Sequence, residues 1–275
     1  MSRKILTVLS EYGYWGEELL GPLTRFDEQG YEVTFLTPRG GRPLALPPSL
    51  DAGFIDPPLG RSVVSEDVAK AAIALDQSDR LDHPEDLSSW IPERPYTSDD
   101  NYLRALESYN REIGDHLDER IACYEALLIV GGSGPIVDLA NNGRVHDLIL
   151  AFLRSGKVIG AECYGVACLA FARDWESRES IIKNKHVTGH CKEYDYKDGT
   201  GFLTTDFNMG PPPYPLEYIL RDATAPGGRY HGNFGKEISV VVDHPFVTGR
   251  STADSFRTGE KMVEVLERGL RRYGW

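Results

Sequence analysis

Short apolar runs alternate with helix-period patterns along most of the chain. The runs are four to nine residues long and many are rich in β-branched residues, which is typical of buried strands. They lie at residues 4–10, 31–38, 124–132, 157–162, 186–189, 237–243 and 246–249. Strands that are separated by helical segments favour a parallel sheet with helices on both faces.

The segments between these runs have the spacing of helices. Residues 17–30 carry leucine and phenylalanine at helical intervals before a glycine, so the first two strands and this helix form a β-α-β unit with a right-handed crossover. Further helices are predicted over residues 145–156, directly after Cys163, and over residues 252–273. The pattern therefore predicts a three-layer α/β/α sandwich with a mainly parallel sheet.

Residues 42–120 interrupt this alternation. They are rich in Pro, Asp and Ser, with weaker helical patterns at 65–76 and 101–120. We interpret this stretch as an insertion that packs over one end of the sheet, within a single domain spanning residues 1–275. A second irregular stretch, residues 207–233, is expected to supply another wall of the site.

The composition narrows the function classes. With 275 residues, 41% of them apolar and 26% charged, the chain has the makeup of a globular protein. No apolar run reaches the ~18 residues of a membrane-spanning helix, and the N-terminal run is too short for a signal peptide, so we expect a cytoplasmic protein without membrane contact. The net charge of −12 argues against nucleic acid as a partner.

The four cysteines show no metal-binding spacing. Cys123, Cys163, Cys168 and Cys191 form no CxxC pair, and no further Cys or His supports a site at His190 and Cys191. We therefore expect no metal, no cofactor and reduced thiols. Cys123 and Cys168 are expected to be packed as structural residues.

Cys163 has a more specific setting, in the stretch "VIGAECYGVACLA" at residues 158–170. It follows a buried run and precedes a helix, with small neighbours that allow a sharp turn and close packing. Serine hydrolases use the same strand-turn-helix device in the sequence G-x-S-x-G. The alternative is a core cysteine that packs as a small hydrophobe; in the turn, amide groups at a helix N-terminus would lower the pKa of the thiol.

Several segments together resemble one family. "GYWGEELLGPLTRFDEQGYEVTFLTPRGG", "YEALLIVGGSGPIVDL", "SGKVIGAECYGVACLA", "HVTG", "PLEYIL" and "FVTGRSTADS" follow one another in the order found in the ThiJ/PfpI superfamily. The chain is most similar to the branch of heat shock protein 31 and glyoxalase III. The resemblance implies the flavodoxin-like fold shared with class I glutamine amidotransferases, a small-molecule substrate and a homodimer.

The resemblance also implies roles for individual residues. Cys163 would be the nucleophile, and Glu18, four residues before Pro22, would be the acid that hydrogen-bonds its sulfur. The backbone amides of Gly132 and Tyr164 would form an oxyanion hole. Taken without the family, Glu18 is better explained as a first-turn helix carboxylate favoured by the helix dipole, a purpose that Glu17 would serve equally well.

Two histidines of the branch are absent from this chain. Tyr164 stands where the branch has a histidine after the cysteine, and Ser133 stands where it has one in the glycine-rich loop. A general base must then come from elsewhere or from Glu18 alone. His190 is the first candidate, because it follows a predicted strand near Glu193 and Asp195, and His231 is the second.

The remaining candidates concern substrate binding. Trp15, Ser133, Glu162 and His231 lie in or near the predicted site loops. Glu162 replaces the small apolar residue usual in the family, and the sequence allows it to face either a dimer contact or a substrate cation.

Three functions are compatible with these residues. The leading one is a glyoxalase III-like conversion of a 2-oxoaldehyde to a hydroxy acid by thiolate addition, although the missing histidines weigh against its proton transfers. The second is an isonitrile hydratase or another small-molecule hydratase or hydrolase. The third, from a different class, is a redox-sensitive stress protein or holdase chaperone.

Overall fold

A computed structural model describes residues 3–95, 97–195, 212–232 and 238–275. Within them, one eight-stranded sheet has the order β10-β8-β9-β5-β4-β1-β2-β3. The bounds of its strands are β1 Lys4–Val8, β2 Glu32–Thr37, β3 Glu85–Asp86, β4 Tyr124–Ile129, β5 Val158–Glu162, β8 Val240–Asp243, β9 Phe246–Gly249 and β10 Arg272–Tyr273. The strands from β9 to β3 run parallel, and β8 and β10 pair antiparallel at one edge.

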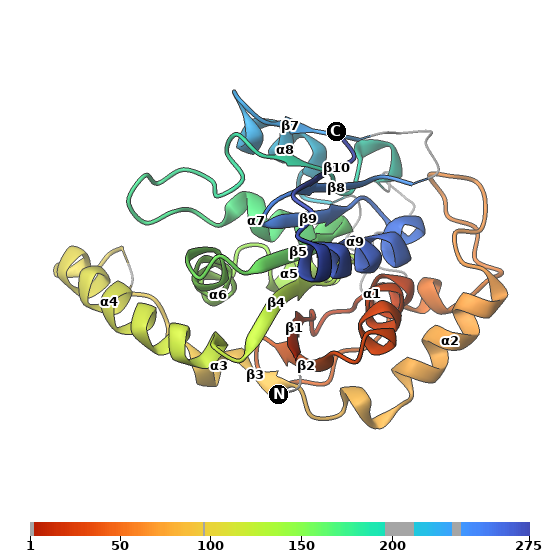
Figure 1. The fold of residues 1–275 in the computed structure, drawn as a ribbon, viewed down its shortest axis with the longest axis horizontal. Helices are drawn as coiled ribbons and strands as arrows, with labels where there is room; N and C mark the ends of the chain where they lie inside the picture. The colour runs from red at the N-terminus through yellow and green to blue at the C-terminus, as the bar shows by residue number, and fades with distance from the viewer. Residues whose placement is uncertain (1–2, 96, 196–211, 233–237) are drawn as a thin grey trace.

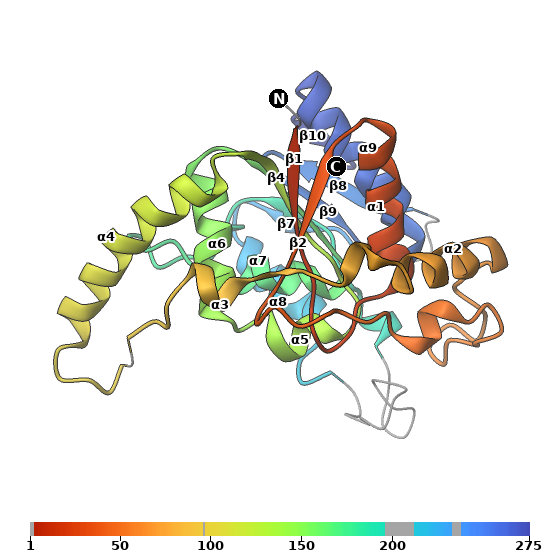
Figure 2. The same cartoon turned by 90° about the horizontal axis from the view of Figure 1, so that it is seen from below.

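Helices cover both faces of this sheet (Figures 1 and 2). The bounds of the α-helices are α1 Gly16–Glu28, α2 Glu66–Asp76, α3 Leu87–Trp90, α4 Tyr102–Ile121, α5 Gly134–Asp138, α6 Gly143–Arg154, α7 Ala167–Phe171, α8 Leu216–Thr224 and α9 Ser255–Arg268. α1 and α9 pack together on one face, while α6 and α7 lie on the other. The predicted α/β/α sandwich with a mainly parallel sheet is confirmed.

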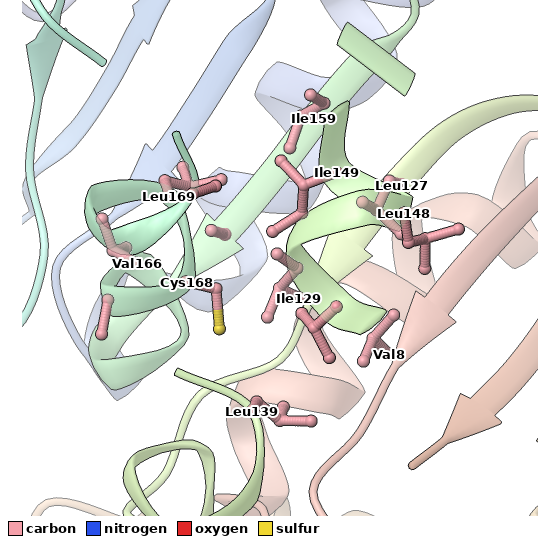
Figure 3. Packing of buried hydrophobic residues seen from close by; sticks show 14 of the residues in the cluster. Val8, Leu127, Ile129, Leu139, Leu148, Ile149, Ile159, Val166, Cys168 and Leu169 are labelled. Atoms are coloured by element: carbon pink, nitrogen blue, oxygen red, sulfur yellow. The ribbon is translucent and has the colours of Figure 1, made fainter. Parts of the chain in front are cut away.

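The two-residue period of the strands divides the core into two layers. In β4, Leu127 and Ile129 join the cluster under α6 and α7, whereas Ala126 and Leu128 join the cluster under α1 and α9. Both layers exclude solvent, so the central strands read as continuous apolar runs. Figure 3 shows the first layer, in which Cys168 lies among the buried side chains. The prediction of a core position for Cys168 is confirmed, but the one for Cys123 is wrong because that residue is exposed.

The interrupting segment builds structure of its own. The helical patterns near 65–76 and 101–120 are confirmed as α2 and α4. α2 packs against α1, β3 extends the sheet beside β2, and α4 packs against α6. These contacts place parts of residues 42–120 along the sheet edge and on both helical layers.

Several local expectations differ from the structure. The strand at 186–189 is shorter, β6 (His186–Val187), and pairs with β7 (Arg229–Tyr230) in a separate small sheet. The helix after Cys163 begins as a 3-10 turn over Cys163–Val166 and ends at Phe171. The irregular stretch 207–233 contains α8 and β7, and its residues 207–211 and 233 lie outside the described part. Among the described residues, none of the helices combines the length and apolarity needed to cross a membrane.

Candidate active site

The turn after β5 holds Cys163 in an unusual backbone conformation. Its φ is 53°, in the left-handed region that non-glycine residues seldom adopt. Such a conformation costs on the order of 1 kcal/mol and is concentrated at functional sites. The residue is buried, with 5% of its surface exposed. The backbone geometry of a strained strand-to-helix turn therefore agrees with the expected elbow.

Two glycines after β4 let three segments meet at the sulfur. A Cβ on Gly131 would lie 2.3 Å from Oε2 of Glu18 and 2.6 Å from Cβ of Cys163. Gly132 has a φ of 91°, and a Cβ there would lie 2.5 Å from the backbone nitrogen of Trp15. No side chain fits at either position without displacing the backbone of the site. The close approach explains why this loop is "GGSG".

Glu18 reaches the sulfur from the first turn of α1. Its carboxyl lies beside Cys163, and the thiol of Cys163 and the backbone amide of Gly132 both act to lower the pKa of this carboxyl. Only 2% of the residue is exposed, and Oε2 is a buried oxygen without a hydrogen-bond partner among the described residues. Burial raises the pKa of Glu18 to about 8, so the carboxyl holds its proton at neutral pH.

The thiol of Cys163 is also protonated in the resting site. Burial and the Glu18 carboxyl raise its pKa well above the usual value, while the amides of Gly132 and Tyr164 act in the opposite direction. The expected lowering of this pKa is therefore wrong in direction. The sequence showed the turn and its amides, but not the burial or the carboxyl beside the sulfur.

This electrostatic setting predicts how Cys163 reacts with iodoacetamide. The alkylation rate of Cys163 should increase only at a higher pH than that of the exposed Cys123. The reason is that only the thiolate is nucleophilic and the pKa of Cys163 is raised. Glu18→Gln should shift the Cys163 curve to lower pH, since it removes the negative charge that opposes ionisation. Peptide-resolved mass spectrometry between pH 6 and about 10 measures both curves in one sample. An unshifted Cys163 curve in the variant would contradict this electrostatic account.

His190 is the histidine that contacts the sulfur of Cys163. It follows β6, and its Nδ1 is 3.5 Å from Sγ of Cys163. Its backbone nitrogen donates to the carbonyl of Cys163 at 3.4 Å, which holds the two segments together. The structure thus brings Cys163, Glu18 and His190 into one cluster.

Asp195 extends this cluster. Its Oδ1 is 3.0 Å from Nε2 of His190, without the alignment of a hydrogen bond in the resting structure. The same oxygen accepts a hydrogen bond of 2.6 Å from the phenol of Tyr164. The sequence interpretation named Asp195 only as a neighbour of His190. In the sequence, Asp195 is visible only as a carboxylate that follows His190 by five residues. Its contacts with His190 and Tyr164 form only because the folded chain brings this loop next to the elbow.

Glu162 points away from any surface. It is fully buried, and its Oε1 accepts a hydrogen bond of 2.8 Å from Ser255 at the start of α9. In the part of the chain that the structure describes, its Oε2 has no hydrogen-bond partner. Burial and the nearby Glu18 carboxyl raise the pKa of Glu162 well above its usual 4.5. Neither of the roles considered for it, a dimer contact or a substrate cation, agrees with a side chain enclosed between β5 and α9.

The buried Glu162 carboxyl predicts a pH-dependent cost to stability. Below pH 4.5 the group is protonated in both folded and unfolded chains, so it adds no pH dependence. Above that pH the unfolded carboxyl ionises and the folded one does not, which costs about 1.4 kcal/mol per pH unit up to the folded-state pKa. Glu162→Gln keeps the acceptor for Ser255 and cannot ionise. Urea unfolding should show the variant gaining stability over the parent chain as pH rises; a constant difference would contradict the assignment.

The other candidate residues are placed as follows. Ser133 precedes α5 in the glycine loop. Within residues 3–95, 97–195, 212–232 and 238–275, neither its buried hydroxyl nor the indole nitrogen of Trp15 has a hydrogen-bond partner. Trp15 is held beside this loop by a 3.3 Å bond from its backbone nitrogen to the carbonyl of Gly131. These two polar groups remain candidates for substrate contact.

His231 is engaged elsewhere. Its Nε2 lies 2.8 Å from Nδ1 of His186, whose ring stacks on Trp275 at 3.5 Å. Burial and the neighbouring His186 lower the pKa of His231 to about 4. Its contacts among the described residues are with β6 and its surroundings, so His190 is the histidine that the fold brings to the sulfur.

Comparison with known proteins places this arrangement in a family. Residues 9–190 match the family model described as ThiJ/PfpI family-like. A glutamine amidotransferase-like class 1 domain-containing protein 1 from Bos taurus is 30% identical over 134 residues, covering 49% of this chain and 56% of that protein. The chain therefore matches only about half of the length of this curated relative.

Solved structures agree on the fold. Glyoxalase III from Candida albicans is 19% identical with a TM-score of 0.61, and the match covers 95% of this chain and 96% of that one. The 24 kDa rapid encystment protein of Francisella tularensis is 19% identical with a TM-score of 0.58, covering 96% and 99%. The match begins at residue 9, directly after β1, ends at His190 and includes the glycine loop and the elbow, and the chain belongs to the ThiJ/PfpI-like family.

Proposed function

We propose that the chain is a cysteine-dependent enzyme that converts a 2-oxoaldehyde and water into a 2-hydroxy acid. One observation carries this proposal: Glu18 and His190 both contact the sulfur of Cys163, from α1 and from the loop after β6. The site thereby holds a nucleophile and two groups able to exchange protons. The absent histidines of the branch are replaced by one imidazole from another segment.

The first step is addition of the sulfur to the aldehyde carbon. Nδ1 of His190 takes the thiol proton, and the new imidazolium is stabilised by the carboxylate of Asp195 next to Nε2. The thiolate attacks the aldehyde, and the amides of Gly132 and Tyr164 stabilise the oxygen that becomes negative. His190 then returns its proton to that oxygen, which gives a hemithioacetal.

The second step moves protons between the two carbons. Neutral His190 removes the C1 hydrogen as a proton and delivers it to C2, while the C1 hydroxyl proton passes to the C2 oxygen. No electrons enter or leave, and the product is a thioester of the 2-hydroxy acid. Glu18, protonated at neutral pH, donates a hydrogen bond to the C2 oxygen as charge develops there. Water then cleaves the carbon–sulfur bond and restores the thiol.

The test is incubation of the purified protein with methylglyoxal in the absence of added thiol. Formation of lactate at the rate of methylglyoxal loss, with none in a Cys163→Ala control, supports the proposal. Loss of methylglyoxal without lactate, together with adducts on exposed Cys123 or Lys residues, would indicate scavenging and would overturn it.

A second candidate is a small-molecule hydrolase or hydratase. It is favoured by Asp195, because a cysteine, an imidazole and a carboxylate in sequence are the groups used in acyl transfer. Such an enzyme needs no proton transfer between carbons. Turnover of p-nitrophenyl acetate or an alkyl isonitrile that depends on Cys163, with no lactate from methylglyoxal, would favour this candidate.

A further inference from the structure

Tyr164 contacts both members of the His190–Asp195 pair. Its ring stacks on the imidazole, with centroids 4.0 Å apart and planes 23° from parallel. Its phenol donates a 2.6 Å hydrogen bond to Oδ1 of Asp195, the oxygen that also faces Nε2 of His190. One side chain therefore limits the tilt of the imidazole and the position of the carboxylate.

The position of Tyr164 in the chain strengthens this connection. It directly follows Cys163, and its own amide acts to lower the pKa of that thiol. Its 4% exposure leaves little freedom for the ring, and residues 163–166 form a tight 3-10 turn. The elbow that holds Cys163 thus also holds Tyr164, the residue that contacts His190 and Asp195.

His190 and Asp195 need contacts that fix their positions, because both come from an irregular segment. Between β6 and Asp195 the chain contains only the short 3-10 turn Lys192–Tyr194. A histidine base must be held in the correct tautomer and orientation, and misplacement by about 1 Å can cost on the order of 10²-fold in rate. In the resting structure the His190–Asp195 contact lacks hydrogen-bond alignment, so it depends on other contacts for its geometry.

We propose that Tyr164 is a positioning residue. It stands where a histidine is expected, and it compensates for that missing imidazole by holding the imidazole of His190, which comes from another segment. Its ring sets the plane of His190, and its phenol fixes Asp195 against Nε2. This inference rests on the proposed role of His190 as the base for Cys163. The phenol itself takes no part in proton transfer to the substrate.

Tyr164→Phe isolates the phenol, because it keeps the ring that stacks on His190. With methylglyoxal, kcat is expected to fall about 10–100-fold, the size seen when the hydrogen-bond partner that orients a metal-bound histidine is lost, and KM is expected to change little. Asp195→Asn should give a similar loss. In the double variant the loss should be no greater than in Asp195→Asn alone, since the phenol acts through Asp195. Additive losses would overturn the proposal, because a residue that only supports packing acts independently of Asp195.

A second readout separates this inference from the reaction itself. The alkylation rate of Cys163, measured against Cys123 in the same sample, reports the base without any substrate. Tyr164→Phe should lower the Cys163 rate in the parent chain and leave it unchanged in a His190→Asn background. If methylglyoxal is not turned over but this pattern holds, the proposed reaction fails and the positioning role stands. If Tyr164→Phe lowers the rate equally in both backgrounds, or not at all, the positioning role is wrong.

Discussion

Cys163→Ala should reduce lactate formation from methylglyoxal to the background rate while the far-ultraviolet spectrum of the protein stays unchanged. Alanine removes the only sulfur that contacts both Glu18 and His190 among the described residues. Without the thiolate there is no hemithioacetal and no thioester, so the loss should reach the detection limit. The measurement is stereospecific lactate detection at several enzyme concentrations.

Cys168→Ala is the matched control for this variant. Cys168 lies five residues further along the same turn-helix segment and is fully buried in the apolar layer shown in Figure 3. Its removal should lower stability by about 1 kcal/mol through a small cavity and should leave turnover intact. Equal loss of turnover in both cysteine variants would point to general disturbance of the segment and against a nucleophile at Cys163.

Glu18→Gln and His190→Asn should each lower kcat by about 10²–10⁴, the range for losing a general acid or base. Glutamine keeps the shape of Glu18 but cannot exchange its proton, and asparagine removes the Nδ1 that faces the sulfur at 3.5 Å. If Glu18 alone exchanged protons, His190→Asn would cost little. The contact of His190 with the sulfur predicts a cost comparable to that of Glu18→Gln.

The pH profile provides an independent check on Glu18. Because its pKa is raised to about 8 by burial, the protonated form dominates at neutral pH and is lost as pH rises through 8. Turnover that requires this proton should therefore decline above about pH 8, and Glu18→Gln should lack that decline at its lower rate. An identical alkaline limb in both proteins would assign the limb to another group.

Glu17→Gln is the control on the same helix turn. Its Oε2 accepts a 2.7 Å hydrogen bond from Thr252, a contact that glutamine can retain. The side chain carries no contact with Cys163 among those described, so its substitution should leave kcat within about twofold, as for a change away from the reacting groups. A loss comparable to that of Glu18→Gln would show that charge in the whole cluster, not the proton on Glu18, sets the rate.

Local periodicity was sufficient to predict the architecture. The apolar runs at residues 4–10, 124–132 and 157–162 are β1, β4 and β5, because strands covered on both faces by helices must be apolar throughout. The short strands at the edges of the sheet were harder to predict from the sequence. β3 and β10 are two residues long, and β6 pairs in a second sheet, so their partners come from distant segments and leave no local pattern.

The chemical identity of the site was partly visible in the sequence. The elbow at Cys163 and the glycine loop are local features, since small residues are needed wherever backbones approach closely. The family resemblance added Glu18. The sequence offered His190 and His231 as alternatives, and only the path of the chain after β6 brings one of them within 3.5 Å of the sulfur while the other pairs with His186.

The protonation of the site and the contacts between its side chains depend on burial and on segments that are distant in the sequence. Sequence reasoning took the amides at the turn as lowering the pKa of Cys163, whereas enclosure of the thiol beside a buried carboxyl raises it. Likewise, the contact of Tyr164 with Asp195 joins residues 31 positions apart. Short-range pattern determines which residues form strands, helices and turns, because those depend on neighbours in the chain. Desolvation and side-chain geometry depend on neighbours in space, and so only the tertiary structure set the protonation and alignment of this site.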